Sequence, residues 1–209
     1  MKIVALGNEA LKEEFLYTEI QEGTQIDWIV SEENFLQYKN ADAFFDLLFQ
    51  PDKKRIEILK SLEPKPVFIN DVSNKKPADA SFIRFNGWPT FLKRKILEAS
   101  CDAVSIKSNA EKIINALGRK VEWVPDIAGF ITARVLAMII NEAFFALGEK
   151  VSSKKDIDIA MKLGTNYPFG PFEWGEKIGF KNIHELLTVL GKINSRYEPA
   201  ALLTDKAFT

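Results

Sequence analysis

The sequence has very few of the residues that build metal centres and disulfides. Its 209 residues include one cysteine, Cys101, and one histidine, His184. A single cysteine permits no internal disulfide, and the sequence has neither a His/Cys cluster nor the paired-ligand spacing typical of a metal site. The short apolar start, Ile3 to Gly7, lacks the length of a secretory signal. We therefore expect no metal site and a reducing, cytoplasmic compartment.

Net charge and long apolar runs are also missing. The chain has 28 Lys and Arg against 29 Asp and Glu, a formal net charge of −1, and its lysines form scattered pairs such as Lys53 and Lys54. That pattern argues against a surface for nucleic acid. The most apolar segment, Asp126–Lys150, is interrupted by Arg134 and Glu142 before it reaches the ~20 apolar residues of a membrane span. Neither nucleic acid nor a membrane is an expected partner.

The first part of the chain alternates strand-like and helix-like patterns. Short apolar runs lie at residues 2–6, 25–30, 43–49, 67–70, 81–85, 96–100 and 120–124. Helical patterns between them lie at residues 9–20, 52–62 and 107–117. Because this alternation is typical of a mostly parallel sheet with covering helices, it predicts an α/β domain over residues 1–124.

A dinucleotide-binding fold needs a glycine-rich loop after its first strand, so that the backbone can approach a pyrophosphate at a helix N-terminus. Here that loop runs from Gly7 to Lys12. Only Gly7 fits the G-x-G-x-x-G pattern, because Glu9 and Lys12 stand where the second and third glycines belong. The second apolar run ends at Val30 without the acidic residue that binds a ribose. We interpret Gly7 as vestigial and expect no cofactor.

The second part, residues 125–209, is predicted to be all helical. Asp126–Lys150 reads as one long helix that is apolar on nearly all sides. Further helical patterns follow at residues 153–164, 171–179 and 182–193. Short helices have too little surface to cover such a rod, so we predict a homodimer through this domain. The expected interface anchors are Met138, Phe144 and Phe145.

Four passages of the second part follow one another at a specific spacing. They are AGFITARVLAMIINEA (128–143), DIDIAMKLG (156–164), YPFGPFEWGEKIG (167–179) and RYEPAALL (196–203). In this order they resemble the C-terminal domain of the 3-hydroxyacyl-CoA dehydrogenases of fatty-acid β-oxidation. More loosely, residues 41–48 and 97–127 resemble the later half of that family's NAD domain. The resemblance implies a shortened, degenerate Rossmann-like domain over 1–124, a helical dimerisation domain over 125–209, and acyl-CoA as ligand.

The chain departs from the family at the residues that carry its chemistry. The family places a histidine shortly before a glutamate as an acid/base pair, whereas Arg84–Phe91 reads RFNGWPTF. Glu98 matches the family's catalytic glutamate, and its partner histidine is absent. The family's serine, proline and asparagine correspond to Asn70, Ala128 and Ala133.

Substitutes for the missing proton acceptor are few. Lys93 and Tyr167 are the remaining candidates, and His184 lies at the edge of the last predicted helix. Metal chemistry offers no replacement either, for want of ligands.

The resemblance therefore implies a member of this lineage whose dehydrogenase activity is lost, a pseudoenzyme. Losing both the loop glycines and the histidine favours this hypothesis, because they supply cofactor binding and proton transfer separately. Three alternatives stay open. The first is an active, divergent NAD-dependent 3-hydroxyacyl-CoA dehydrogenase. The second is a non-catalytic dimer that binds an acyl-CoA or a protein. The third is another dehydrogenase with a similar two-domain plan, such as the 3-hydroxyisobutyrate or nucleotide-sugar type. The PFGPFE passage, residues 168–173, argues against the last.

Overall fold

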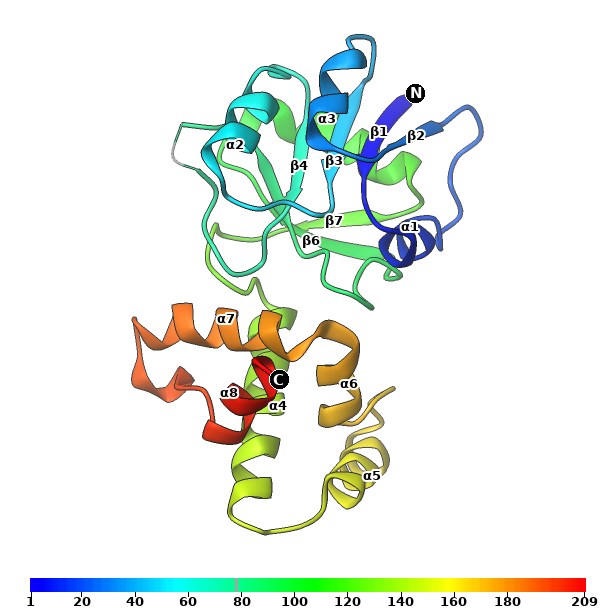
Figure 1. Ribbon diagram of the computed structural model, residues 1–209. Coiled ribbons are helices and arrows are strands. Elements are labelled where there is room, and N and C mark those ends of the chain that lie inside the picture. Colours follow the sequence, from blue (N-terminus) through cyan, green and yellow to red (C-terminus); the bar gives the residue numbers. More distant parts are fainter. Residues whose placement is uncertain (78) are drawn as a thin grey trace. The chain divides into compact units, whose positions relative to one another are not determined.

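The computed structural model describes residues 1–77 and 79–209, which divide into two compact units (Figure 1). We call Met1–Phe130 the sheet unit and Ile131–Thr209 the helical unit. The strands of the sheet unit are β1 (Lys2–Leu6), β2 (Gln25–Ile29), β3 (Ala43–Asp46), β4 (Val67–Asn70), β5 (Ile83–Phe85), β6 (Ile96–Ser100) and β7 (Lys120–Trp123).

These strands form one sheet in the order β2-β1-β3-β4-β5-β6-β7. All neighbouring strands are parallel except β5 and β6, which run antiparallel. The prediction of an α/β fold with a mostly parallel sheet is therefore confirmed. The order reverses at β1, whose neighbours β2 and β3 both follow it in sequence, so the carboxyl ends of β1 and β3 form the switch point of the sheet.

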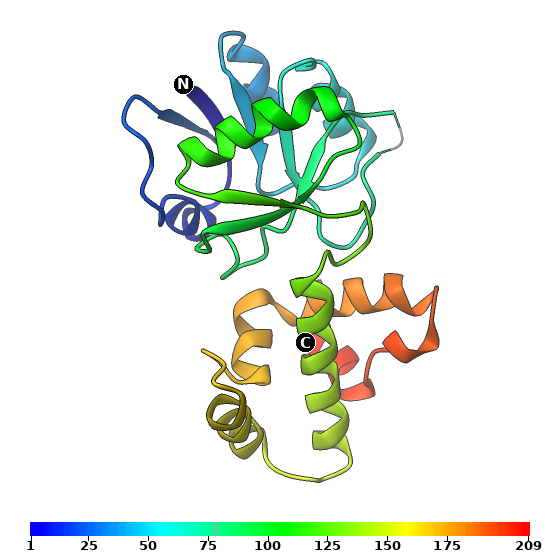
Figure 2. The ribbon, with the colours of Figure 1, turned by 180° about the vertical axis from the view of Figure 1, so that it is seen from behind.

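Helices cover both faces of the sheet, and the strands read accordingly as continuous apolar runs. Successive side chains of a strand point to opposite faces, so Ile3 and Ala5 join one core while Val4 and Leu6 join the other. The first core is covered by α1 (Glu9–Phe15) and α3 (Val104–Ala116), and Figure 2 shows α3 running across the strands. The second is covered by the 3₁₀ helix η1 (Glu32–Gln37) and by α2 (Lys53–Lys60).

The first helix is shorter than its sequence pattern predicts, ending at Phe15 instead of residue 20. The carbonyls of Glu14 and Phe15 accept hydrogen bonds from Arg119 Nη2 at 3.2 and 2.8 Å. Arg119 is 3% exposed, and burial lowers its pKa to about 10. A buried guanidinium therefore takes up the carbonyls at the end of α1 in place of another helical turn.

The helical unit contains only helices among its described residues. They are α4 (Thr132–Gly148), α5 (Lys154–Thr165), α6 (Pro171–Ile178), α7 (Phe180–Gly191), the 3₁₀ helix η2 (Ser195–Tyr197) and α8 (Ala201–Ala207). The all-helical prediction is thus correct for this part, and α8 was not foreseen. No helix among residues 1–77 and 79–209 is long and apolar enough to cross a membrane.

Two boundaries differ from the sequence predictions. The long helix begins at Thr132 and not at Asp126, because Gly129 and Phe130 have positive φ angles of 83° and 49°. The unit boundary lies after Phe130 and not after residue 124. Both follow from how the connecting segment is held, since Gly129 N donates to Val72 O at 2.8 Å and so belongs to the sheet unit.

One expected interface anchor is an internal core residue. Phe144 is 2% exposed, and its ring packs edge to face on Phe172 and Phe180 at 5.0 and 5.5 Å. The prediction that Phe144 anchors a dimer is therefore wrong, because the α6–α7 segment already covers it. Phe145, by contrast, remains 41% exposed.

Candidate functional site

The antiparallel strands β5 and β6 position Glu98. Their register places Phe85 opposite Ala99, so Asn86 follows directly beside Glu98. Asn86 Nδ2 donates to Glu98 Oε2 at 3.2 Å, and Asn86 N donates to the Glu98 carbonyl at 3.0 Å. Both residues are buried, at 2% and 9% exposure. Glu98 therefore has the amide of Asn86 among its side-chain partners.

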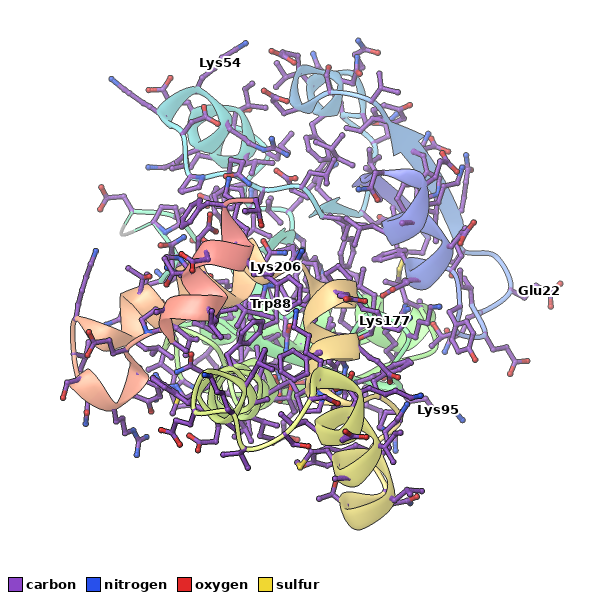
Figure 3. All side chains as sticks on the ribbon, turned by 60° about the horizontal axis from the view of Figure 1, so that its bottom comes forward. Glu22, Lys54, Trp88, Lys95, Lys177 and Lys206 are labelled. Atoms are coloured by element: carbon purple, nitrogen blue, oxygen red, sulfur yellow. The ribbon has the colours of Figure 1, made fainter. Side chains whose placement is uncertain are left out.

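The loop that follows β5 is packed tightly against the sheet unit. Trp88, labelled in Figure 3, is 5% exposed, and its ring meets Phe91 edge to face at 6.3 Å. Thr90 N donates to both carboxylate oxygens of Glu14 at 2.8 Å. The passage that carries a histidine in the resembling family is thus fixed here by aromatic packing and by α1.

Asn70, at the end of β4, links two neighbouring loops. Its Nδ2 donates to the carbonyls of Leu47 and Gly87, both at 3.0 Å, and its Oδ1 accepts from Gly87 N at 2.9 Å. A Cβ added to Gly87 would lie 2.8 Å from the Asn70 side chain, so this position requires glycine. Both amide hydrogens of Asn70 are engaged in holding the loops after β3 and β5.

At the switch point, Gly7 serves packing. A Cβ added there would lie 3.0 Å from Leu47 Cδ1 and 3.1 Å from the Trp28 ring. Leu47 is 2% exposed. At the position where open α/β sheets bind ligands, the side chains of Leu47 and Trp28 therefore pack against Gly7.

The start of α1 does not fit a pyrophosphate. Asn8 Oδ1 accepts from Leu11 N at 2.9 Å and so caps the helix with a side chain of the protein itself. Glu9 adds a carboxylate to the first turn, 3.9 Å from Lys12 Nζ. A negative charge and a filled cap both oppose an anionic ligand at a helix N-terminus.

Two buried ion pairs lie at or near the carboxyl edge of the sheet, and sequence reasoning missed both. Asp46, at the end of β3, is fully buried and accepts from Arg55 Nε at 2.7 Å. Arg84, in the middle of β5, is fully buried and donates from Nε to Asp126 Oδ1 at 2.8 Å. Burial lowers the pKa of Arg84, and Asp126 opposes that shift. An arginine inside an apolar strand was the available signal, since buried charges require partners.

Exposed ion pairs contribute less to stability than these buried pairs. Lys54 extends outward from α2 in Figure 3, and its ammonium group pairs with Glu33 at the surface. Hydrogen bonding to Lys54 lowers the pKa of Glu33 to about 2. Because this pair is open to water, it adds little to stability and marks no site.

The other candidate proton acceptors lie elsewhere. Lys93 is exposed, with its Nζ 5.5 Å from the centre of the Tyr17 ring. Tyr167 packs edge to face on Trp174 in the helical unit, and His184 does the same on Phe208. The described residues contain no group of three metal-ligating side chains. The structure thus brings Asn86 and Glu98 together, whereas the Asn70 side chain bonds the backbone of Gly87, and of these three residues only Glu98 is ionisable.

In the helical unit the resembling passages are explained by packing. Asp158 Oδ1 accepts from Phe172 N at 2.8 Å and so caps α6 from the neighbouring helix. A Cβ added to Gly170 would lie 2.2 Å from Asp158, and one added to Gly175 would lie 2.2 Å from the Phe180 ring. The DIDIAMKLG and PFGPFEWG passages therefore encode the contact of α5, α6 and α7.

Comparison with known proteins agrees with these passages. Residues 129–208 match the family described as 3-hydroxyacyl-CoA dehydrogenase, C-terminal domain. The 3-hydroxyadipyl-CoA dehydrogenase of Escherichia coli is 41% identical over 118 residues, which cover 54% of this chain and 25% of that protein. A 3-hydroxybutyryl-CoA dehydrogenase of Bradyrhizobium diazoefficiens is 38% identical over 96 residues, covering 45% and 33%. The chain thus spans about a quarter to a third of the length of these curated relatives.

The fold also has a close counterpart among solved structures. The (S)-3-hydroxybutyryl-CoA dehydrogenase PaaH1 from Ralstonia eutropha has a TM-score of 0.76 and 20% identity, and the similarity covers 98% of this chain and 92% of that one. At this identity the likeness shows the fold alone. Together with the matched passages, it confirms the resemblance to the 3-hydroxyacyl-CoA dehydrogenase family.

The expectation that no cofactor is used is corrected by these relatives. The matched proteins are dehydrogenases, and theirs is an NAD-dependent family. The loop from Gly7 to Lys12 is a local feature, and it does not decide which cofactor the whole protein uses. The loop does depart from the glycine-rich pattern, but a departure at one loop does not remove NAD as the cofactor of the family.

Proposed function

We propose that this chain, whose residues 129–208 belong to the C-terminal domain of the 3-hydroxyacyl-CoA dehydrogenases of fatty-acid oxidation, no longer performs the proton transfer of that reaction by itself. Oxidation of a 3-hydroxyl needs a group that accepts its proton while a hydride leaves the same carbon. In this chain the amide of Asn86 donates a hydrogen bond to the Glu98 carboxylate at 3.2 Å. This one contact carries the proposal.

An amide differs from an imidazole in the property that matters here. Asn86 Nδ2 can donate a hydrogen bond to Glu98 and hold it in place, as an imidazole nitrogen would. Its nitrogen has no basic lone pair, so it accepts no proton near neutral pH. Asn86 can therefore hold Glu98 by a hydrogen bond as an imidazole would, but it cannot act as an acid or base.

The remaining role under this proposal is to bind an acyl-CoA-like molecule. The relatives named above act, by name, on 3-hydroxyadipyl-CoA and 3-hydroxybutyryl-CoA, which suggests a CoA thioester as the ligand class. The neighbouring polar side chains of Asn86 and Glu98 support this, because β5 ends at the edge where open α/β sheets bind ligands. The cytoplasmic compartment and the absence of a nucleic-acid partner stay predictions.

The test is an assay of the full chain with 3-hydroxybutyryl-CoA and NAD⁺, and of the reverse reaction with acetoacetyl-CoA and NADH. We expect no turnover above the blank in either direction, and saturable binding of acetoacetyl-CoA by calorimetry. Glu98→Gln is the diagnostic variant, and Glu122→Gln on the exposed neighbouring strand position is its control. Turnover that is lost in Glu98→Gln and kept in Glu122→Gln would overturn the proposal.

A further inference from the structure

A basic turn lies just before the strand that carries Glu98. Residues 93–95 read Lys-Arg-Lys, all three are exposed, and β6 follows directly. Because β6 runs antiparallel to β5, this turn lies at the end of β5 where Asn86 donates to Glu98. The four residues from Arg94 to Glu98 span at most about 14 Å of extended chain, so the long Arg94 side chain can reach the surroundings of the Glu98 carboxylate. The site described above therefore has a positive group within reach.

Arg94 is held against a buried aromatic ring. Its Cζ lies 4.1 Å from the centre of the Phe91 ring, and Phe91 is 3% exposed. Burial lowers the pKa of Arg94, and the negative charge of Glu98 opposes that shift. The ring restricts the guanidinium on one side and leaves its N–H donors to other partners.

Arg94 differs from the other arginines of the sheet unit in its hydrogen bonds. Arg55, Arg84 and Arg119 each donate to a carboxylate or carbonyl oxygen. The Arg94 side chain donates no hydrogen bond and forms no ion pair within residues 1–77 and 79–209. A guanidinium has five N–H donors in a planar fork that matches a carboxylate or a phosphate, so this one is suited to an anionic group from outside the chain.

The backbone that carries Arg94 is held by two contacts with other segments. Thr90 N donates to both carboxylate oxygens of Glu14 at 2.8 Å. The Leu92 carbonyl accepts from Arg119 Nε at 3.1 Å. A cation on a turn fixed in this way loses little conformational freedom when it binds an anion, which favours affinity.

We propose that Arg94 binds the terminal carboxylate of an acyl chain, so that the preferred ligand class of this protein is the CoA thioester of a dicarboxylic acid. This inference rests on the proposed function, in which the acyl part of a CoA thioester lies at Asn86 and Glu98. The fork of an arginine pairs with a carboxylate through two parallel hydrogen bonds. It also supplies the positive charge that a second carboxylate near Glu98 requires, because like charges repel.

The phosphates of CoA are the other anions of such a ligand. The long pantetheine arm separates them from the thioester, whereas the end of a short acyl chain lies close to the acyl carbons that would meet Glu98. Arg94 lies in the turn next to Glu98 and is subject to its charge. This placement favours the carboxylate of the acyl chain over a phosphate as the partner of Arg94.

Two thioesters with acyl chains of equal length test the proposal. Adipyl-CoA ends in a carboxylate, and hexanoyl-CoA ends in a methyl group. Calorimetric titration of the full chain should give a Kd for adipyl-CoA at least about tenfold below that for hexanoyl-CoA, because a hydrogen bond between charged groups contributes more than a methyl contact. Titration with CoA alone measures what the phosphates contribute.

Three variants assign the effect to one side chain. Arg94→Met keeps an unbranched side chain over Phe91, and it should raise the Kd of adipyl-CoA at least about tenfold while changing that of hexanoyl-CoA less than about twofold. Arg94→Lys keeps the charge without the fork and should lie between the two. Lys95→Met is the matched control, because Lys95 extends outward from the same turn (Figure 3), and it should leave both Kd values within about twofold. Circular dichroism of each variant establishes that it is folded.

Two outcomes would overturn this proposal while leaving the proposed function in place. One is equal affinity of the unaltered chain for adipyl-CoA and hexanoyl-CoA. The other is an equal loss of affinity for both thioesters and for CoA in Arg94→Met, which would mean that Arg94 binds a phosphate. Absence of binding by either thioester would contradict the proposed function itself, and this inference with it.

Discussion

The helical unit and the sheet unit of this chain differ in how far their residues agree with the family's sequence pattern. The helical unit matches its family over residues 129–208, and its matched positions are packing positions such as Gly170 against Asp158. The sheet unit has one seven-stranded sheet, an amide beside Glu98, and a loop after β1 whose one glycine in residues 7–12 is Gly7. A change at a packing position affects all the side chains that contact it, whereas a change at a reactive position alters one functional group. The same fold can therefore accommodate different side chains at a site.

The largest expected effect tests whether the helical unit is held by its own core. Phe144→Ala should lower the free energy of unfolding by about 4 kcal/mol, because it empties the space between Phe172 and Phe180. The neighbouring Phe145→Ala, at a position 41% exposed, should cost below about 1 kcal/mol per folded chain. Chemical denaturation measures both. Equal effects would show that Phe145 belongs to the same core.

A second effect tests whether the sheet unit depends on a buried ion pair instead. Arg84→Met should destabilise the protein by about 3 kcal/mol, because Asp126 keeps a largely buried charge without its guanidinium partner. Arg94→Met, which removes a guanidinium stacked on Phe91 at 4.1 Å, should cost below about 1 kcal/mol. Denaturation curves that fail to distinguish the two variants would contradict a special role for Arg84.

A third effect concerns Gly170, a glycine of the matched passages that packs against Asp158. Gly170→Ala should destabilise by about 2 kcal/mol, since its Cβ would lie 2.2 Å from the Asp158 side chain that caps α6. Gly164→Ala is the matched control, because nothing lies within 4 Å of its added Cβ in α5. It should stabilise by about 0.5 kcal/mol through helix propensity. Thermal unfolding gives the sign of both changes.

The smallest effect is a pH dependence in the sheet unit. Burial raises the pKa of Asp71, although Asn74 donates to it. A raised folded-state pKa favours the protonated form, so this stabilising contribution is complete below the unfolded pKa of about 4 and is lost as pH rises through the folded value. Asp71→Asn should therefore gain on the unaltered chain as pH rises, by about 0.5 kcal/mol. A gap that stays constant with pH would contradict the shift.

Sequence by itself determined the element types, because strand and helix have distinct periods and the apolar runs of residues 2–6 or 67–70 are short and bounded. It also determined the family resemblance of the helical unit, through passages whose glycines and aromatics are dictated by local contacts. Glu98 and the missing histidine were likewise readable in the linear order of residues.

Only the tertiary structure decided which residues meet. Asn86 became the partner of Glu98 through the antiparallel register of β5 and β6, which no local pattern specifies. The start of α4 at Thr132 depends on a hydrogen bond from Gly129 to Val72, 57 positions earlier in the sequence. The physical reason is common to both cases. Propensity and periodicity act over neighbouring residues, whereas hydrogen bonds and burial between distant segments exist only once the chain has folded.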